Sequence, residues 1–174
     1  QPTLPSATAT STGCSVQLAT QALASDAIVL IVPRDHALTQ ISTAQLARLY
    51  AGYTPDWSDL GAGSGPVEFV TRESGAAART LFESAVMNGE PISSAAVVMP
   101  NDQGVLDYVE GHPGAIGYLP LAYVTEDVHV VALDSQLPDI QHLSDGTYPL
   151  TYTLLLCTAP STSTDAQRFA NFAL

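Results

Sequence analysis

The sequence predicts an α/β fold with a largely parallel sheet. Residues 27–33 (AIVLIVP) form a continuous apolar run rich in β-branched side chains, which is typical of a strand buried on both faces. Between runs of this kind, apolar residues recur at helical spacing, and capping residues mark the helix starts. The resulting order of strand, helix, strand, helix, strand, helix and strand is characteristic of α/β proteins.

The first third of the chain is expected to pass from linker to strand to helix. Residues 1–13 (QPTLPSATATSTG) are rich in Pro, Ser and Thr, and we expect them to be linker-like. An extended segment follows over residues 16–33. Ser42 and Gln45 then form a capping-box pattern ahead of apolar residues at helical spacing, which predicts a helix. Residues 54–66 contain Pro and several Gly and Ser, which favours a loop.

The remainder of the chain continues the alternation of strands and helices. Strand-length apolar runs are separated by segments of helical periodicity that carry their own caps. The predicted elements are strand 67–70, helix 75–86, strand 96–99, a helix from Asn101 or Asp102 to Gly111, strands 115–119, 128–133 and 148–157, and a final helix from Thr164.

Composition excludes several classes of function. The chain has 174 residues, a net charge of −12, five Arg and no Lys. So few cations cannot form the basic patch that nucleic acid or an anionic membrane surface requires. No apolar run is long enough to span a bilayer. Because no signal-peptide pattern is present, the chain is expected to be a mature or excised fragment.

The stretch FVTRESGAAARTLFE, residues 69–83, is the strongest candidate for a binding site. It places Arg72 between a predicted strand and a predicted helix, just before residues with very small side chains. The first N–H groups of a helix are unpaired and its dipole is positive there, so an anion could bind these groups and the guanidinium together. Alternatively, Arg72 pairs with Glu73 or another carboxylate, and Ala76, Ala77 and Ala78 only pack. The residues alone leave both interpretations open.

No catalytic, cofactor or metal motif is present. The Gly-rich segment GAGSGP lacks nucleotide-binding spacing and precedes a strand, and there is no GxSxG elbow. The sequence therefore predicts no enzyme, no cofactor and no metal site. Cys14 and Cys157 are either two unrelated thiols or a disulfide formed in an oxidising compartment. None of the four histidines has metal-ligand spacing to another His or to Cys: His36, His112, His129 and His142.

Several segments, in order, resemble one family. They are DAIVLIVP (26–33), ISTAQLARLYAGYTPDWSDLG (41–61), FVTRESGAAARTLFE (69–83), NDQGVLDYVEGHPGAIGYLPLAYV (101–124) and the tail YPLTYTLLLCT…AQRFANFAL. This set is similar to the LTxxQLxxIYxGxxxxW, RxxGSGT and QGVxxxVxxxPGAIGY segments of substrate-binding proteins of phosphate ABC transporters. The resemblance covers about residues 20 to 174.

The resemblance implies a periplasmic-binding-protein-like (type II) fold, in which two α/β lobes are joined by crossover strands. It also implies a protein that works outside the cytoplasm, periplasmic or on the cell surface and lipid-anchored where the full-length protein carries an anchor. Such a protein binds phosphate or a similar oxyanion and delivers it to the permease of an ABC transporter. Sulfate, molybdate and organic acids remain open as ligands.

The resemblance also assigns site residues. The Arg and Gly of RxxGSGT fall on Arg72 and Gly75, whereas its Ser, Gly and Thr fall on the segment Ala76–Ala78. Ser74 is a candidate replacement for a lost hydroxyl, and Tyr118 is expected to shape the cleft. Loss of two hydroxyl donors would weaken phosphate binding by roughly two to four orders of magnitude. The alternative function is therefore an interaction or sensor module with a degraded ligand site.

The family topology implies a division of the chain that lacks most of lobe I. Residues 1–14 would be a linker-like segment and residues 15–33 crossover strands, followed by the α/β lobe II over residues 34–147. Residues 148–174 would hold the return crossover and the terminal helix of a partial lobe I. Because the two crossovers run in opposite directions, the resemblance also implies a disulfide between Cys14 and Cys157.

Overall fold

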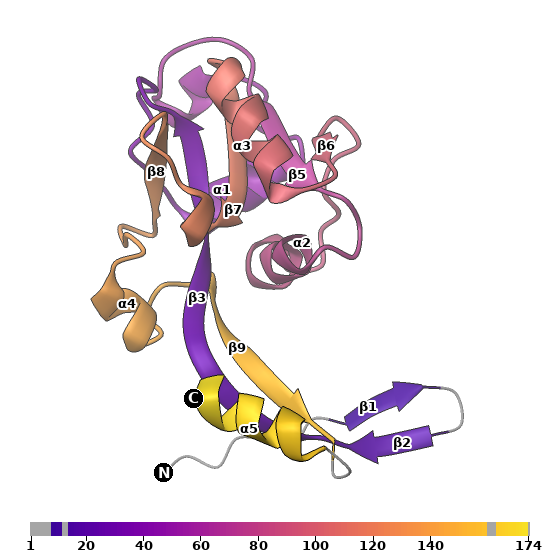
Figure 1. Cartoon of the computed structure of the whole chain (residues 1–174). Coiled ribbons are helices and arrows are strands. Elements are labelled where there is room, and N and C mark those ends of the chain that lie inside the picture. The colour runs from indigo at the N-terminus through magenta and orange to yellow at the C-terminus, as the bar shows by residue number, and fades with distance from the viewer. Residues whose placement is uncertain (1–7, 12–13, 160–162, 174) are drawn as a thin grey trace. The chain divides into compact units, whose positions relative to one another are not determined.

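The computed structural model describes residues 8–11, 14–159 and 163–173 (Figure 1). The chain divides into two compact units. Unit 1 comprises residues 1–26 and 152–174, and unit 2 comprises residues 27–151. The boundary between the units therefore falls within one strand, β3 (Ala19–Pro33), and at the start of another, β9 (Thr151–Thr158).

A mixed sheet forms the centre of unit 2. Its strand order is β4-β8-β3-β7-β5-β6. β3 is antiparallel to both β7 and β8, whereas β5 is parallel to both β6 and β7, and β4 is parallel to β8. The prediction of a largely parallel sheet is corrected here, because β3 runs against both of its neighbours. The strands besides β3 are β4 (Gln40–Ile41), β5 (Glu68–Arg72), β6 (Val97–Met99), β7 (Ala115–Pro120) and β8 (Val128–Leu133).

The helices of unit 2 begin where the capping pattern predicts. The predicted capping box of Ser42 and Gln45 opens α1 (Thr43–Tyr50), and the Asn101 side chain accepts from Gly104 N to cap α3 (Asp102–Gly111). α2 (Ala77–Phe82) has no side-chain cap and continues as one π-helical turn, η2 (Glu83–Met87). The shorter helices are η1 (Trp57–Leu60), η3 (Leu121–Tyr123) and α4 (Ile140–Ser144).

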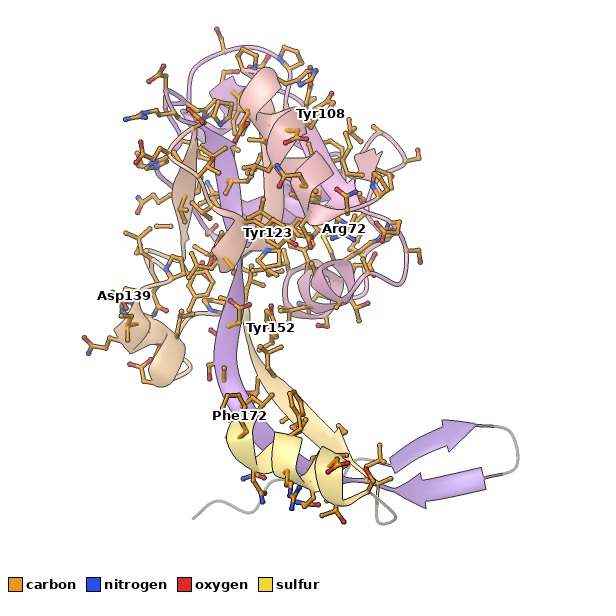
Figure 2. All side chains as sticks on the ribbon, viewed as in Figure 1. Arg72, Tyr108, Tyr123, Asp139, Tyr152 and Phe172 are labelled. Carbon is orange, nitrogen blue, oxygen red and sulfur yellow. The ribbon has the colours of Figure 1, made fainter. Side chains whose placement is uncertain are left out.

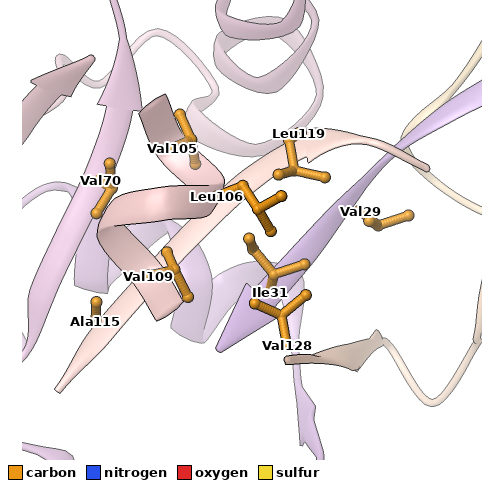
Figure 3. Packing of buried hydrophobic residues seen from close by; sticks show 9 residues of the cluster. All are labelled: Val29, Ile31, Val70, Val105, Leu106, Val109, Ala115, Leu119 and Val128. Carbon is orange, nitrogen blue, oxygen red and sulfur yellow. The ribbon is translucent and has the colours of Figure 1, made fainter. Parts of the chain in front are cut away.

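One core cluster of unit 2 lies between its sheet and α3 (Figure 3). Gly117 of β7 lets the helix approach the sheet closely, since a Cβ at this position would lie 2.7 Å from Val105 Cγ1 and 3.1 Å from Val109 Cγ2. The cluster contains Val29, Ile31, Val70, Val105, Leu106, Val109, Ala115, Leu119 and Val128. Gly117 therefore has a packing role, and it lets α3 pack directly on β7 beside β5.

Unit 1 is built from a hairpin, β9 and the last helix. β1 (Thr8–Ser11) pairs antiparallel with β2 (Cys14–Gln17), β9 pairs with β3, and α5 spans Thr164–Ala173. Residues 8–11 are thus a strand, although the sequence predicted a linker there; alternating Thr favours extended backbone. None of the helices that the structure describes is long and apolar enough to cross a membrane.

The expected disulfide between Cys14 and Cys157 is not supported. Cys157 lies on β9 as a free, exposed thiol. Cys14 opens β2, where its main chain pairs with Ser11 of β1; its side chain lies outside those described. The prediction depended on neighbouring crossovers, and the segment before β3 turns into a hairpin of its own.

Candidate functional site

The loop that follows β5 carries the residues predicted to bind an anion. β5 ends at Arg72 and α2 begins at Ala77, so residues 73–76 form the connection. Gly75 has a φ of 90°, a left-handed conformation that favours glycine, and a Cβ there would meet nothing within 4 Å. Ser74 and Ala77 are exposed. The loop therefore presents its backbone to solvent at the carboxyl end of β5.

Arg72, which is labelled in Figure 2, is held by two carboxylates. Its Nε and Nη2 each donate to the carboxylate of Glu73 at 3.0 Å, and its Nη1 donates to Asp102 Oδ1. Nη2 also approaches the carbonyl of Pro100 at 3.4 Å. The hydrogen bonds from Arg72 hold the pKa of Glu73 below its usual value, and those to Glu73 raise the pKa of Arg72. The sequence left Arg72 either free or paired, and in this structure it is paired.

Sequence reasoning missed Asp102 as a partner of Arg72. Parallel pairing of β5 with β6 places Arg72 opposite Met99, and α3 begins three residues later at Asp102. The carboxyl ends of parallel strands meet at one sheet edge, so residues just after each strand become neighbours. Knowledge that β5 and β6 are adjacent would have been sufficient to identify this contact.

The start of α2 offers unpaired backbone donors. In the part of the chain that the structure describes, the N–H groups of Ala77, Ala78 and Arg79 donate no hydrogen bond. Ala76 occupies the N-cap position and has no side chain that could accept from them. Water or a ligand must satisfy these groups. Ala78 itself is buried, so its side chain anchors the turn.

Arg79 lies next to Arg72 but is also engaged. Its Nη1 donates to the carbonyl of Arg72 at 3.0 Å, and its Nε donates to Glu83 Oε1 at 2.7 Å. Its side chain retains 19% of its exposure. Arg79 therefore tethers the loop backbone to α2 and contributes little free positive charge.

Tyr118 lies beneath the loop rather than on its surface. Its side chain is fully buried, its hydroxyl is 2.6 Å from Thr71 Oγ1, and its ring stacks on Phe82 with centroids 4.3 Å apart. Burial raises the pKa of Tyr118, so it stays neutral. A residue that shapes a cleft is expected to face solvent. In this structure Tyr118 instead lies in the interior, where it supports the end of β5 and the helix α2.

The loop combines backbone donors with an almost neutral set of side chains. Two guanidinium groups, Arg72 and Arg79, meet three carboxylates, Glu73, Glu83 and Asp102. Such a surface can bind an anion through backbone N–H groups and one rearranged Arg. Among the described residues, no group of three or more His, Cys, Asp or Glu side chains could hold a metal ion.

Two larger pockets of unit 2 lie away from this loop. One of about 530 Å³ is lined mainly by residues between β4, α1 and the turn after β8, including Ile41, Ser42, Gln45 and Asp134. The other, of about 850 Å³, includes His36, Trp57, Glu68, Glu110 and Asp127. Neither pocket includes any residue from 72 to 78. The candidate site is therefore an open loop surface in unit 2.

In sequence, the chain is similar to phosphate-binding proteins. It is 27% identical over 118 residues to phosphate-binding protein PstS of Bacillus subtilis (strain 168), which covers 67% of this chain and 39% of that protein. It is 28% identical over 117 residues to phosphate-binding protein PstS 2 of Streptococcus pneumoniae serotype 4, which covers 63% of this chain and 40% of that protein. The chain thus spans about two fifths of the length of these curated relatives.

Solved structures share the fold. One is a Clostridium perfringens protein described as a phosphate ABC transporter substrate-binding protein with bound phosphate. Its TM-score is 0.83 at 23% identity, over 89% of this chain and 65% of that chain. An ABC-type phosphate transport receptor from Vibrio cholerae has a TM-score of 0.76 at 22% identity, over 90% and 66% of the two chains. Identities this low establish the fold alone.

The family of this chain is shown by a family model that matches most of its length. A family model described as the PBP superfamily domain matches residues 6–174, nearly the whole sequence. The resemblance inferred from the ordered motifs is thereby confirmed, and so is the expected fold. The chain belongs to the PBP superfamily.

Proposed function

We propose that this chain is part of an extracytoplasmic solute-binding protein of the phosphate ABC transporter type. Its ligand would be phosphate or a similar oxyanion, bound by Arg72 and the backbone N–H groups of residues 74–78. The observation that carries this proposal is that the short connection after Arg72 leads directly to the unpaired N–H groups of Ala77, Ala78 and Arg79 at the start of α2. Similarity to proteins described as phosphate-binding supports the choice of ligand.

The donors suit an oxyanion in charge and in number. A hydrogen bond to a charged group contributes about 1.5–3 kcal/mol, so the remaining N–H donors would still bind an oxyanion, although more weakly than with the hydroxyl groups that Ala76 and Ala78 lack. Ser74 is exposed on the same loop and could add one hydroxyl. Gly75 permits a close approach, because nothing lies within 4 Å of the position of a Cβ there. Tyr118 would act from below, by fixing Thr71 and the end of β5.

The proposed partner is the permease of an ABC transporter, which would receive the ligand outside the cytoplasm. In this assignment residues 34–147 form the larger lobe. Residues 15–33 and 148–158 would be the crossovers, and the terminal helix would belong to a second lobe. Binding and release require no covalent step, so we propose no enzymatic activity.

Calorimetric titration with phosphate, sulfate and a small carboxylate panel tests the proposal. We expect saturable phosphate binding in the wild-type chain and a loss of at least about tenfold in affinity in Arg72→Ala, because the charged fork is removed. Arg168→Ala is the matched control, since Arg168 is 79% exposed on α5. Equal binding by both variants would place the ligand elsewhere.

A second candidate function is an interaction or sensor module with a degraded ligand site. It is favoured by the two carboxylates that already occupy Arg72 and by the absence of hydroxyl groups in Ala76–Ala78. Such a module would give no heat with any of the anions in the same titration. Absence of heat in both the wild type and the variants of the loop would favour this function over the first.

A further inference from the structure

We propose that Glu73 is an internal competitor for the oxyanion: its carboxylate occupies the fork of Arg72, and ligand can use that fork only after Glu73 moves away. This inference rests on the proposed function and concerns the regulation of that same site. The sequence identifies Glu73 only as an alternative partner of Arg72. The family motif RxxGSGT assigns Glu73 no role in binding, because the residue at this position, the first x, is variable.

The geometry of the pair carries the proposal. Nε and Nη2 of Arg72 donate in parallel to the two carboxylate oxygens of Glu73, both at 3.0 Å. This two-bond arrangement is the one that arginine uses to bind carboxylate and phosphate ligands. Glu73 therefore occupies the position at which an external oxyanion would make its strongest contact with Arg72.

Exposure indicates which of the two carboxylates would leave. The side chain of Glu73 is 45% exposed, whereas that of Asp102 is 20% exposed and that of Arg72 is 11% exposed. Asp102 opens α3 and contacts the other guanidinium nitrogen, Nη1, so it can remain while the Nε–Nη2 edge is vacated. Water solvates the half-exposed Glu73 carboxylate, so the loss of its contact with Arg72 is partly offset by hydration and the exchange of Glu73 for a ligand is feasible.

The backbone next to Glu73 can remain in place during this exchange. The Ala76 N–H donates to the Glu73 carbonyl at 3.2 Å, so a turn fixes the main chain, while the side chain is held through Arg72 and its own backbone N–H. Only side-chain rotation is needed to free the fork. The presence of Glu73 also adds a negative charge beside any bound anion, which lowers affinity a second time.

Phosphate titrations of three variants at pH 7 and fixed salt test the proposal. Glu73→Gln and Glu73→Ala should bind phosphate about fivefold or more tightly than the wild type, because competition and repulsion are both relieved. Glu90→Gln is the matched control: it removes one exposed negative charge from the same unit and leaves Arg72 untouched. It should bind as the wild type does.

The outcomes separate this inference from the proposed function. Phosphate binding that depends on Arg72 but is equal in the wild type, Glu73→Gln and Glu73→Ala would overturn the competitor and leave the proposed function intact. Binding by none of these chains would overturn both. Tighter binding in the Glu73 variants that Arg72→Ala then abolishes in the double variants would support both.

Nitrogen-15 spectra provide a second readout, since the chain has five arginines and therefore only five Nε–H signals. In the wild type, phosphate should shift the Arg72 Nε–H signal because one acceptor replaces another. In Glu73→Gln, the signal should be shifted before phosphate is added and should respond at a lower phosphate concentration. An Arg72 signal that is insensitive to Glu73→Gln would show that the two side chains are not paired, which would overturn the proposal.

Discussion

The two units of the molecule differ in how their apolar side chains are placed. Among the described side chains, every residue of the buried core lies in unit 2 except Ala170. Large exposed apolar side chains, by contrast, are as numerous in the small unit 1 as in unit 2. Those of unit 1 are Leu23, Leu154, Leu155, Phe169 and Phe172 (Figure 2 labels Phe172).

The contrast shows that an apolar sequence does not by itself make a core. β9 contains Leu154, Leu155 and Leu156 in succession, a pattern typical of a strand buried on both faces, yet the first two are 45% and 46% exposed. Unit 2 buries its strands because helices cover its sheet, as α3 covers β7 at Gly117. A strand contributes hydrophobic stabilisation only when a second layer covers it.

Two phenylalanine-to-alanine substitutions give the sharpest test of this comparison. Phe82 is fully buried against Tyr118 in unit 2, so Phe82→Ala should lower the free energy of unfolding by about 3–5 kcal/mol. Phe172 is 87% exposed on α5, so Phe172→Ala should change it by less than about 0.5 kcal/mol. Urea titration followed by the fluorescence of Trp57, the single tryptophan, reports on unit 2. Equal losses would show that Phe172 is covered in solution.

Two glycine-to-alanine substitutions test the close approach of α3 to the sheet. In Gly117→Ala the new methyl group would overlap Val105 and Val109, which should cost about 1–3 kcal/mol of stability. Gly111 ends α3 and a Cβ there meets nothing within 4 Å, so Gly111→Ala should be neutral or slightly stabilising. Thermal unfolding of both variants measures the difference. A tolerated Gly117→Ala would mean that α3 can move away from β7 at little cost.

A second contrast, between local and long-range features, explains what the sequence could predict. The helix starts at Ser42 and Asn101 were predictable, because a capping side chain and its helix are local in the chain. The partners of Arg72 were only partly predictable. Glu73 is adjacent in sequence, whereas Asp102 becomes a neighbour only through the pairing of β5 with β6. Long-range contacts depend on strand order, which periodicity does not determine.

The same reasoning explains why the hairpin of β1 and β2 and the burial of Tyr118 were not foreseen. The hairpin of β1 and β2 was mistaken for a linker, because its Thr and Ser residues are common in both loops and exposed strands. The burial of Tyr118 was also unforeseen, since a family motif gives the position of a residue but not the direction of its side chain. Orientation depends on the packing of α2 against β7, through Phe82.

The smallest expected effect concerns the pH dependence of the Arg72–Glu73 pair, on the exposed side of unit 2. Because Arg72 holds the folded-state pKa of Glu73 below its unfolded value, the pair stabilises the protein at pH values above the unfolded pKa. This stabilisation is lost as pH falls through the lowered folded-state pKa. The wild type should therefore be slightly more stable than Glu73→Gln near neutral pH, and the stabilities of the two should converge in acid.

Urea midpoints at low salt, at neutral pH and at about pH 3, measure this difference, with Glu90→Gln as the control for net charge. A stability difference that does not change with pH would mean that Glu73 is unpaired in solution, and the fork of Arg72 would then be open to ligand at all times.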